Sequence, residues 1–488
     1  MNTLTNMKFF DRKTLTVTET IFKIFFFIYA AASYCSVTYG HPVISFLMWP
    51  TALVGAIVLI QRLVLFKEYK SMPVLLPGIA FALCMGISIL ANFSYDLKLN
   101  IILFGYFIFY FCIIFTQNQT TTLDKLKSEM SFFSYLFIIY TTLAIVASFI
   151  IMFAGFSSIR HVNADNFEVI IGFESGRLWG VFLGPNGGAT FSLVSMALML
   201  GRIFKSKKFI LRFLLSVNIV LHMLYITFSD SRTALVCILV VPIFTALLYA
   251  IGSDKQKKMR FVKPILTSIL ATVLCFTFVY SAKYSYNNIV TKFNAAQNQT
   301  SLNKPDELPP DELPPNEKPS NDYETIDRDY NLEDDYSNRR FDLWKSGLEV
   351  YKDTPKNMVV GTSFYGMRMY AYEHLPNTYL VNNTQIDFAN FHNEFVNILV
   401  AQGALGFSVI VWMILSIIIF VVKNIKNLNK FNSVEFATAA AVVLILAVAS
   451  MFIPGVFYLF SPGSIAFWMF LGYAVMLLKK GNSQEDLV

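Results

Sequence analysis

Long apolar runs separated by short basic segments constrain this sequence more than any other feature. A helix needs about 20 apolar residues to cross the hydrocarbon core of a bilayer. By that rule we predict transmembrane helices near residues 20–39, 42–61, 73–92, 98–116, 132–155, 187–204, 209–228, 233–252, 262–282, 394–421, 434–457 and 461–478. Composition agrees, because 55% of the residues are hydrophobic and 15% are charged, whereas soluble domains have about 25% charged residues.

Lysine and arginine residues predict how these helices are oriented. Basic clusters lie before the first predicted helix and after each even-numbered one: Lys8, Arg12 and Lys13; Arg62, Lys67 and Lys70; Lys125 and Lys127; Lys205, Lys207 and Lys208; Lys255, Lys257, Lys258 and Arg260; Lys423, Lys426 and Lys430; Lys479 and Lys480. Since cytoplasmic loops carry the excess of these residues, both termini are predicted to be cytoplasmic. The net charge of +7 therefore does not indicate nucleic-acid binding.

Two longer segments fall on the predicted outer side, at about 156–186 and 283–393. The second begins with an acidic, proline-rich stretch in which residues 303–335 hold twelve acids and three bases. Proline density and net charge predict an extended spacer there. From Arg340 onward the spacing of apolar residues predicts helices, and hence a small cap over the outer membrane surface.

These features divide the chain into five predicted parts. They are the first five transmembrane helices (1–155), central helices with arginine motifs (156–282), the acidic insert (283–338), an extracytoplasmic loop domain with helical segments (339–393), and the last three transmembrane helices (394–488). The predicted fold is an all-α polytopic membrane protein with about twelve helices and one large outer loop between the ninth and tenth.

Besides Arg328 in the acidic insert, six arginines lie on the predicted outer side, where topology gives no reason for cations. They are Arg160, Arg177, Arg232, Arg339, Arg340 and Arg368. The planar fork of a guanidinium binds two phosphate oxygens at once. The set therefore indicates a site for a lipid-linked diphosphate at the membrane surface. The alternative for any one arginine is that it snorkels or pairs with a nearby acid.

Two of these arginines occur in informative contexts. Arg177 shortly precedes Gly184-Pro185-Asn186-Gly187-Gly188, a turn signal that leads into a predicted helix. Such a helix start can direct backbone N–H groups toward an anion. Arg232 follows Ser231, a plausible N-cap, at the start of another predicted helix.

His392 and Asn393 lie at the start of the tenth predicted helix. If that helix extends back to His392, then His392, Val396, Leu399, Gly403 and Gly406 share one face. Glycines on that face would allow another helix to approach closely. Histidine accepts a proton near neutral pH, so His392 suits a general base acting on a sugar hydroxyl. A hydrogen-bonded interfacial histidine is the alternative that stays open.

Other polar residues are weaker candidates. His374 is a reserve candidate for the base, and the nearby acids Asp342, Glu373, Asp387 and Glu394 could orient or assist the histidine. His222 is predicted to be a satisfied residue inside the helix bundle. The five cysteines all lie in apolar runs without a CxxC pair, which disfavours a zinc or disulfide framework. Nothing in the sequence indicates a nucleotide or a metal.

These motifs together resemble the O-antigen ligase and O-antigen polymerase (Wzy-type) family of lipid-linked glycan transferases. His392-Asn393, nine residues, Gly403, two residues, Gly406 resembles the family's ligase motif. The contexts of Arg177 with Asn186, of Ser231-Arg232, and of Arg340 with Trp344 are similar to family segments in the same order. The resemblance extends over about residues 170–421.

The resemblance implies a GT-C-like membrane glycosyltransferase without metal or other cofactor. Its donor would be a glycan on undecaprenyl diphosphate, and its acceptor a hydroxyl of lipid A core or of a lipid-linked glycan. Arg232 and Arg340 would bind the diphosphate, with Arg177 as a further donor-binding residue. His392 would be the catalytic base, supported by Asn393, Trp344, Asn186 and Arg339. A single displacement would invert the anomeric carbon.

The resemblance also implies a location and leaves alternatives. It places the chain in the bacterial inner membrane, among membrane lipids, with the active site facing the periplasm. The expected activity is that of an O-antigen or surface-polysaccharide ligase. A repeat-unit polymerase of the same family is the first alternative, and a flippase of lipid-linked sugars, from a different class, is the second.

Overall fold

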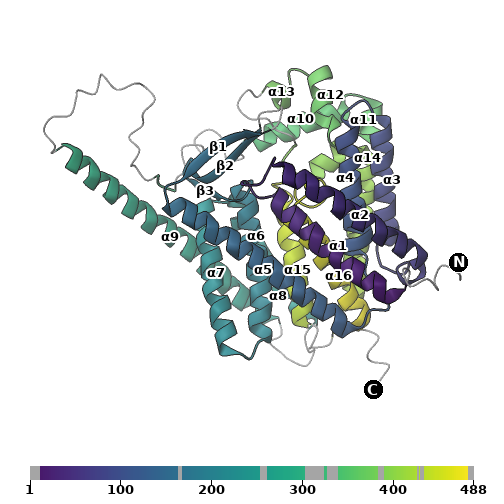
Figure 1. Ribbon diagram of the computed structural model, residues 1–488, viewed down its shortest axis with the longest axis horizontal. Helices are drawn as coiled ribbons and strands as arrows, with labels where there is room; N and C mark the ends of the chain where they lie inside the picture. The colour runs from purple at the N-terminus through teal and green to yellow at the C-terminus, as the bar shows by residue number, and fades with distance from the viewer. Residues whose placement is uncertain are drawn as a thin grey trace.

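The computed structural model describes residues 11–162, 167–252, 261–302, 324–326, 339–382, 390–425, 428 and 433–481 (Figure 1). Within these ranges, ten helices are long and apolar enough to cross a membrane. Two shorter apolar helices, α3 (Leu75–Ala91) and α15 (Ser433–Ala449), occupy the third and eleventh predicted positions. The polytopic helical architecture is therefore confirmed, whereas the number of membrane crossings and their orientation stay predictions.

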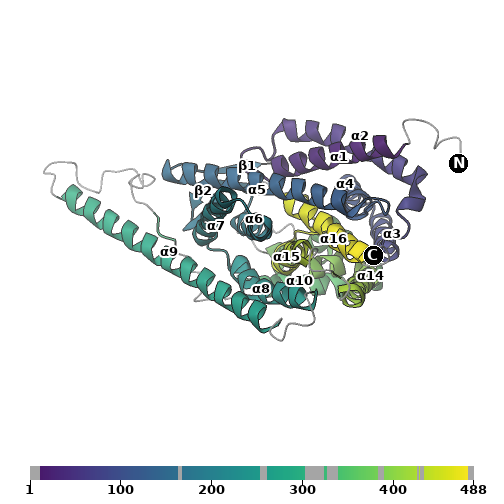
Figure 2. The same cartoon turned by 90° about the horizontal axis from the view of Figure 1, so that it is seen from below.

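Most of the long helices are joined by short connections, except before the helices that begin at Pro185 and Glu394. Besides α3 and α15 they are α1 (Arg12–Ser33), α2 (Pro42–Val64), α4 (Leu97–Phe109), continued by the π-helix η4 (Tyr110–Phe115), α5 (Leu123–Phe153), α6 (Pro185–Lys205), α7 (Phe209–Ser229), α8 (Arg232–Gly252), α9 (Val262–Leu302), α14 (Glu394–Asn424) and α16 (Pro462–Gly481). A short 3₁₀ turn, η3 (Phe66–Glu68), follows α2. Figures 1 and 2 show that α15 lies among α6, α8 and α16, while the far part of α9 extends away from the other helices.

Four short helices form the cap. They are α10 (Arg340–Lys352), α11 (Pro355–Val360), α12 (Gly366–His374) and α13 (Tyr379–Asn382). In Figure 1 they lie above the upper end of α14 and α3, and α10 and α11 both pack against α14. Helical segments are therefore present where the sequence predicted them.

Ion pairs gather several basic clusters at one end of the bundle. Arg12 at the start of α1 pairs with Glu68 at 2.6 Å (Nε to Oε1). Lys479 in the last turn of α16 donates to a backbone carbonyl in the same α2–α3 connection at 2.8 Å. Lys205 at the end of α6 pairs with Glu435 near the start of α15. These contacts place the basic residues at a common end, as the predicted alternation requires.

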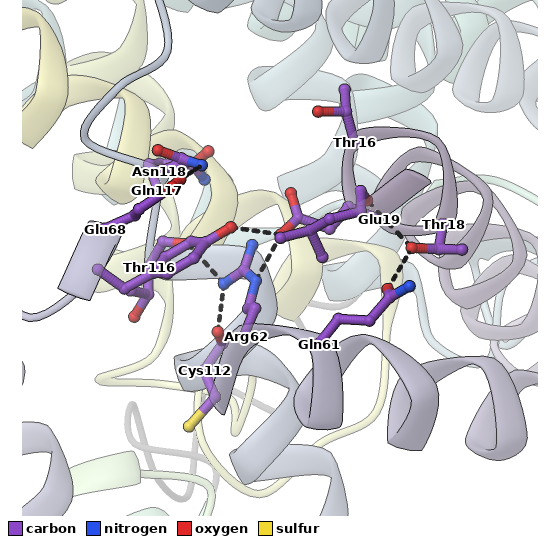
Figure 3. Close-up of polar contacts among 12 residues, drawn as sticks. Thr16, Thr18, Glu19, Gln61, Arg62, Glu68, Cys112, Thr116, Gln117 and Asn118 are labelled. Carbon is purple, nitrogen blue, oxygen red and sulfur yellow. Dashed lines mark hydrogen bonds and ion pairs between the residues drawn. The ribbon is translucent and has the colours of Figure 1, made fainter. Parts of the chain in front are cut away.

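A buried guanidinium explains the π-helix at that end (Figure 3). Arg62 of α2 is 6% exposed and pairs with Glu19 of α1 at 2.6 Å. Its Nη1 donates to the carbonyl oxygens of Cys112 and, at 2.8 Å, of Thr116. Widening the helix to i→i+5 bonds leaves carbonyls available for an outside donor, and Arg62 supplies it. Removing one partner of a buried ion pair costs about 3–5 kcal/mol.

One segment departs from the otherwise helical fold. The loop predicted over 156–186 contains a three-stranded antiparallel sheet, β1 (Ser157–Val162), β2 (Phe167–Glu174) and β3 (Arg177–Gly180). Ser175 and Gly176 join β2 to β3 with φ values of 52° and 67°. Positive φ at both central residues is the geometry of a type I′ hairpin turn. Val169, Ile170 and Ile171 before the Ser175-Gly176 pair are the local sequence signal for these strands.

The eleventh predicted helix, 434–457, is also too long. The helix α15 ends at Ala449, and residues 450–461 form an irregular connection to α16. The chain there is still apolar, so composition alone extended the prediction. Pro454 disfavours helical backbone at the residue before it, and Gly455 adds backbone freedom, which explains why the helix stops.

The predicted continuous face from His392 to Gly406 does not form. The helix α14 begins at Glu394 with Asn393 as its N-cap, so His392 lies outside it. Gly403 has φ 62° and ψ −167°, and these values interrupt the helix. A Cβ at Gly406 would meet the Gln402 side chain of the same helix. The two glycines therefore differ in role, because Gly403 alone admits a second backbone.

That second backbone comes from the cap. Gly361, at the end of α11, has φ 74° and ψ −168°, and a Cβ there would lie 2.3 Å from the carbonyl carbon of Ala401. A Cβ at Gly403 would lie 2.4 Å from that of Val359. The N–H groups of Thr362 and Ser363 donate to the carbonyls of Val400 and Ala401 at 3.0 and 2.9 Å. The two chains thus cross with direct backbone contact.

Most of the acidic insert, including 303–323 and 327–338, lies outside the described residues. Residues 324–326 are described and dock beside the sheet and α9. The Ile326 side chain is buried, and its backbone N–H and C=O bond to the Asn287 side chain at 2.8 and 2.9 Å. Glu324 accepts from the N–H of Gly176 at 3.0 Å. The insert is therefore attached next to the turn that precedes Arg177.

We predict that Gly403→Ala lowers the thermal stability of the purified protein by about 1–3 kcal/mol, because its backbone conformation is accessible essentially to glycine only. Gly86→Ala in α3 is the matched control, since an added Cβ there meets nothing within 4 Å. Unfolding of both variants would be followed in detergent by circular dichroism. Equal stability of the two variants would contradict the close backbone crossing.

Candidate functional site

Arg177, Asn186 and Ser231 form one polar cluster at the outer-predicted end of α6 and α8. Arg177 in β3 is 9% exposed; its Nε donates to the Ser229 carbonyl at 2.9 Å, and its Nη2 donates to Asn186 Oδ1 at 3.0 Å. Ser231 Oγ donates to the same oxygen at 2.9 Å. Asn186 lies in the first turn of α6, directly after Pro185. The cluster therefore ties the sheet to the starts of two helices.

Arg232 is the first residue of α8 and is partly exposed. The preceding turn is held in place on both sides. Asp230 ends α7 with φ 45° and pairs with Lys283 of α9 at 3.3 Å. Ser231 Oγ accepts from the N–H of Ala234 at 3.3 Å, so the predicted N-cap is confirmed. Arg232 therefore follows the turn that Arg177 binds, and its side chain is more exposed to solvent than that of Arg177.

Arg340 and Trp344 lie on α10 in the cap. The partly exposed Arg340 guanidinium is 5.8 Å from the ring centroid of Phe452, in the connection after α15. Trp344 Nε1 donates to the carbonyl of Phe391 at 3.0 Å. Phe391 is fully buried and precedes His392 directly. The helix that carries Arg340 is thus fastened to the segment that carries His392.

His392 lies in a tight turn before α14. Its φ of 48° is left-handed, and its N–H donates to Asn390 Oδ1 at 2.8 Å. Asn393 caps the helix by accepting from the N–H groups of Phe395 and Val396 at 2.9 and 3.2 Å. Strained backbone of this kind costs about 1–3 kcal/mol and often occurs at functional sites. The turn fixes where the imidazole can lie.

The electrostatic surroundings keep the His392 side chain neutral. Desolvation by the surrounding protein, and then the positive charge of Arg340, lower the pKa of His392 to about 4. A lowered pKa favours the neutral imidazole at pH 7, while the Arg340 guanidinium remains charged.

The packing of α8 against α15 brings Arg232 and the turn of His392 to the same end of the helix bundle. Cys237 of α8 contacts the carbonyl of Ile445 in α15 at 3.6 Å. The two helices run antiparallel, so Arg232 and Ser450 both lie about 7.5 Å further toward the cap, five residues from this contact. The carbonyl of Ser450 accepts from the N–H of Glu394 at 2.9 Å. Arg232 and the His392 turn are therefore both close to the end of α15.

A small cavity lies between the start of α6 and the connection that follows α15. Residues from the end of α1, the start of α6 and the 450–461 connection line it, among them Tyr34, Gly187, Phe191, Ser450, Pro454 and Gly455. Gly187 follows Asn186, and Ser450 bonds to the first residue of α14. The cavity therefore adjoins residues next to Asn186 and Glu394, and Arg232, Arg340 and His392 are not among its lining residues.

The remaining sequence candidates have local partners. Arg160 in β1 donates to the carbonyl of Ser36, and Arg368 in α12 stacks on Tyr372 at 5.3 Å. Arg339 is the residue before α10 and has φ 61°. His374 packs edge-on against Tyr370 with centroids 4.4 Å apart.

Two further predictions concern residues away from the arginine clusters. His222 is buried and contacts the Asn218 carbonyl at 2.9 Å and Thr141 at 3.3 Å, so its predicted structural role is confirmed. Within the described ranges, no group of three or more His, Cys, Asp and Glu side chains is placed to hold a metal ion.

Sequence reasoning missed the 450–461 connection, which supplies both the ring beside Arg340 and a wall of the cavity. Its signal was weak, because Pro454-Gly455 lies in a run that is otherwise apolar. Among the predicted acids, Asp387 lies outside the described residues, and Glu373 accepts from the Tyr95 hydroxyl at 2.8 Å, away from His392.

Comparison with known proteins is consistent with this arrangement. The sequence model of a family described as O-antigen ligase matches residues 217–411. The matched segment is about two-fifths of the chain and includes Arg232, Arg340, His392, Gly403 and Gly406, whereas Arg177 and Asn186 precede it. No curated protein matches the chain. The match supports the assignment of this chain to the O-antigen ligase and polymerase family of multi-pass membrane proteins that act on lipid-linked polysaccharides.

Proposed function

We propose that this protein is a surface-polysaccharide ligase that transfers a glycan from undecaprenyl diphosphate to an acceptor hydroxyl on the outer face of the bacterial inner membrane. The observation that carries the proposal is that Trp344, on the helix that begins with Arg340, donates to the carbonyl of Phe391, which directly precedes His392. A base and an anion-binding group side by side are what a displacement with a diphosphate leaving group requires.

In the proposed reaction, the acceptor hydroxyl attacks the anomeric carbon of the donor glycan. His392 takes the hydroxyl proton as the new C–O bond forms, and the bond to the diphosphate oxygen breaks. The lipid diphosphate leaves with its electron pair, and Arg232 and Arg340 bind its oxygens. One displacement inverts the anomeric carbon, and the step needs no metal or other cofactor. Arg177 and Asn186 position Arg232, since their donors and acceptors join the ends of β3, α6 and α8.

Donor binding would also activate the base. The Arg340 charge contributes to the low pKa of His392 in the free protein. A bound diphosphate would offset that charge and add negative charge nearby, which favours protonated histidine. The pKa of His392 would then rise toward neutrality, where a general base is most effective.

A polymerase of repeat units is the alternative within the same chemistry. The two activities differ in the acceptor, which is lipid A core or another finished acceptor for a ligase and a second lipid-linked glycan for a polymerase. Purified protein offered each acceptor separately, with the lipid-linked donor and without ATP or metal, distinguishes them. Movement of donor across vesicles without product would instead indicate a flippase.

We predict that His392→Ala lowers the rate of transfer by about 10²–10⁴-fold, the usual contribution of a general base. Arg232→Ala should also abolish most product, because it removes a donor to the leaving group. His374→Ala is the matched control, since that histidine packs on Tyr370 in the cap. Product would be measured by mobility of the labelled glycan. If His374→Ala abolished transfer and His392→Ala did not, His374 and not His392 would be the base.

We predict that Arg340→Lys lowers kcat/KM by about tenfold or more. Lysine keeps the charge but lacks the planar fork that binds two oxygens, and a hydrogen bond to a charged group contributes about 1.5–3 kcal/mol. Steady-state kinetics with varied donor would measure the loss. Unchanged kinetics would argue against diphosphate binding at this position.

We predict that Arg340→Gln moves the acid limb of the kcat/KM profile to higher pH. Transfer requires neutral His392, so activity falls as pH drops through the pKa of that residue, which Arg340 lowers. Removing the charge raises this pKa toward its usual value. Arg212→Gln is the control: it removes the charge of an exposed arginine near the start of α7, and the acid limb should stay at the same pH. A limb that does not move would contradict the coupling.

A further inference from the structure

Glu394, the first residue of α14, has a carboxylate that is buried next to the candidate site. The residue is 2% exposed, and it follows His392 and Asn393 directly. Its Oε1 accepts from the N–H groups of Phe457 and Tyr458 at 2.5 and 3.1 Å, and its Oε2 accepts from that of Gly455 at 3.3 Å. The carboxylate thus serves three backbone donors of the connection between α15 and α16.

The backbone of Glu394 binds the same connection at its other end. Its N–H donates to the carbonyl of Ser450 at 2.9 Å. Residues 450 to 458 are therefore closed into a loop by one residue, through the main chain at the start and through the side chain at the end. A carboxylate suits this role, because both of its oxygens accept, whereas the NH2 group of a glutamine would face the N–H of Gly455 and could not accept from it.

The loop that Glu394 closes carries residues of the candidate site. Phe452 is the ring near Arg340, with 5.8 Å between the guanidinium carbon and the ring centroid. Pro454 and Gly455 line the cavity that faces Gly187 at the start of α6. The position of the loop therefore determines how the Arg340 guanidinium is supported and how wide the cavity is.

We propose that Glu394 is a positioning residue for donor binding: by closing the 450–458 loop, it keeps Phe452 beneath Arg340 and holds that guanidinium beside His392. Glu394 touches neither substrate nor reacting atoms in this role, and it acts through Arg340. The inference rests on the proposed function for its kinetic consequence, whereas the loop closure itself is a property of the structure.

The kinetic test is a double-mutant cycle between Glu394→Gln and Arg340→Gln. Glu394→Gln should lower kcat/KM about tenfold in the otherwise unchanged protein and no more than about twofold in the Arg340→Gln background, because residues that act as one unit are not additive. Independent, multiplying effects would overturn the proposal. Phe452→Leu should lower kcat/KM similarly and should not add to Glu394→Gln, and it provides a second route should Glu394→Gln fail to fold.

Glu435→Gln is the matched control. Glu435 is another buried acid, but it pairs with Lys205 at the opposite end of α15. It should leave kcat/KM of the folded protein unchanged and should show no coupling to Arg340→Gln. If Glu435→Gln coupled to Arg340→Gln as strongly as Glu394→Gln does, the loss of any buried carboxylate would produce the coupling. The proposal would then be wrong.

Hydrogen exchange tests the loop without reference to activity. In Glu394→Gln, peptides that contain Phe457 and Tyr458 should exchange at least tenfold faster than in the wild type, while peptides of α6 and α8 keep their rates. Unchanged exchange in the loop would overturn the closure. Absence of transfer in the wild type, or full transfer in Arg340→Gln, would instead refute the proposed function while leaving this measurement valid.

Discussion

The crossing of two backbones at Gly361 and Gly403 is the contact on which the site depends. A break in a helix within a bilayer exposes carbonyls that water cannot reach, so each needs a partner from the protein. The carbonyl of Ala401 accepts from Ser363 N–H at 2.9 Å and from Ser88 Oγ at 2.6 Å. The cap thereby becomes part of the hydrogen bonding of α14, rather than a domain that merely rests on the bundle.

This attachment determines where the charged residues lie. The helix α10 packs against α14 through Gly347, where an added Cβ would lie 3.0–3.2 Å from Val396 and Phe391. With Trp344 bonded to the Phe391 carbonyl, Arg340 cannot shift without moving the turn that holds His392. A cation and a neutral imidazole are thus fixed together. That combination repels a second cation and attracts an anion, which is why we propose a diphosphate donor for it.

The sequence predicted those features that depend on local pattern. Apolar runs located the long helices, and the position of Arg232, Arg340 and His392 between them predicted which end of the bundle carries chemistry. It could not predict the break at Gly403, because one glycine in an apolar run is compatible with a continuous helix. Nor could it distinguish Arg177, whose burial and bonds to Ser229 and Asn186 arise from packing of the sheet. Such roles depend on residues far apart in the chain, and no spacing rule encodes them.

Three departures from regular helix share one physical solution. The π-helix η4 yields carbonyls that Arg62 binds, the break in α14 yields carbonyls that the cap and Ser88 bind, and the loop after α15 yields N–H groups that Glu394 binds. In each case polar groups from another segment satisfy backbone that a bilayer would otherwise penalise. The π-helix η4 lies at the end where the basic clusters gather, and Arg62 joins it to α1 and α2. The loop after α15 lies beside Arg340 through Phe452, and the break at Gly403 joins the cap to the helix that follows His392. The irregular backbone around the candidate site is therefore held by polar groups of other segments.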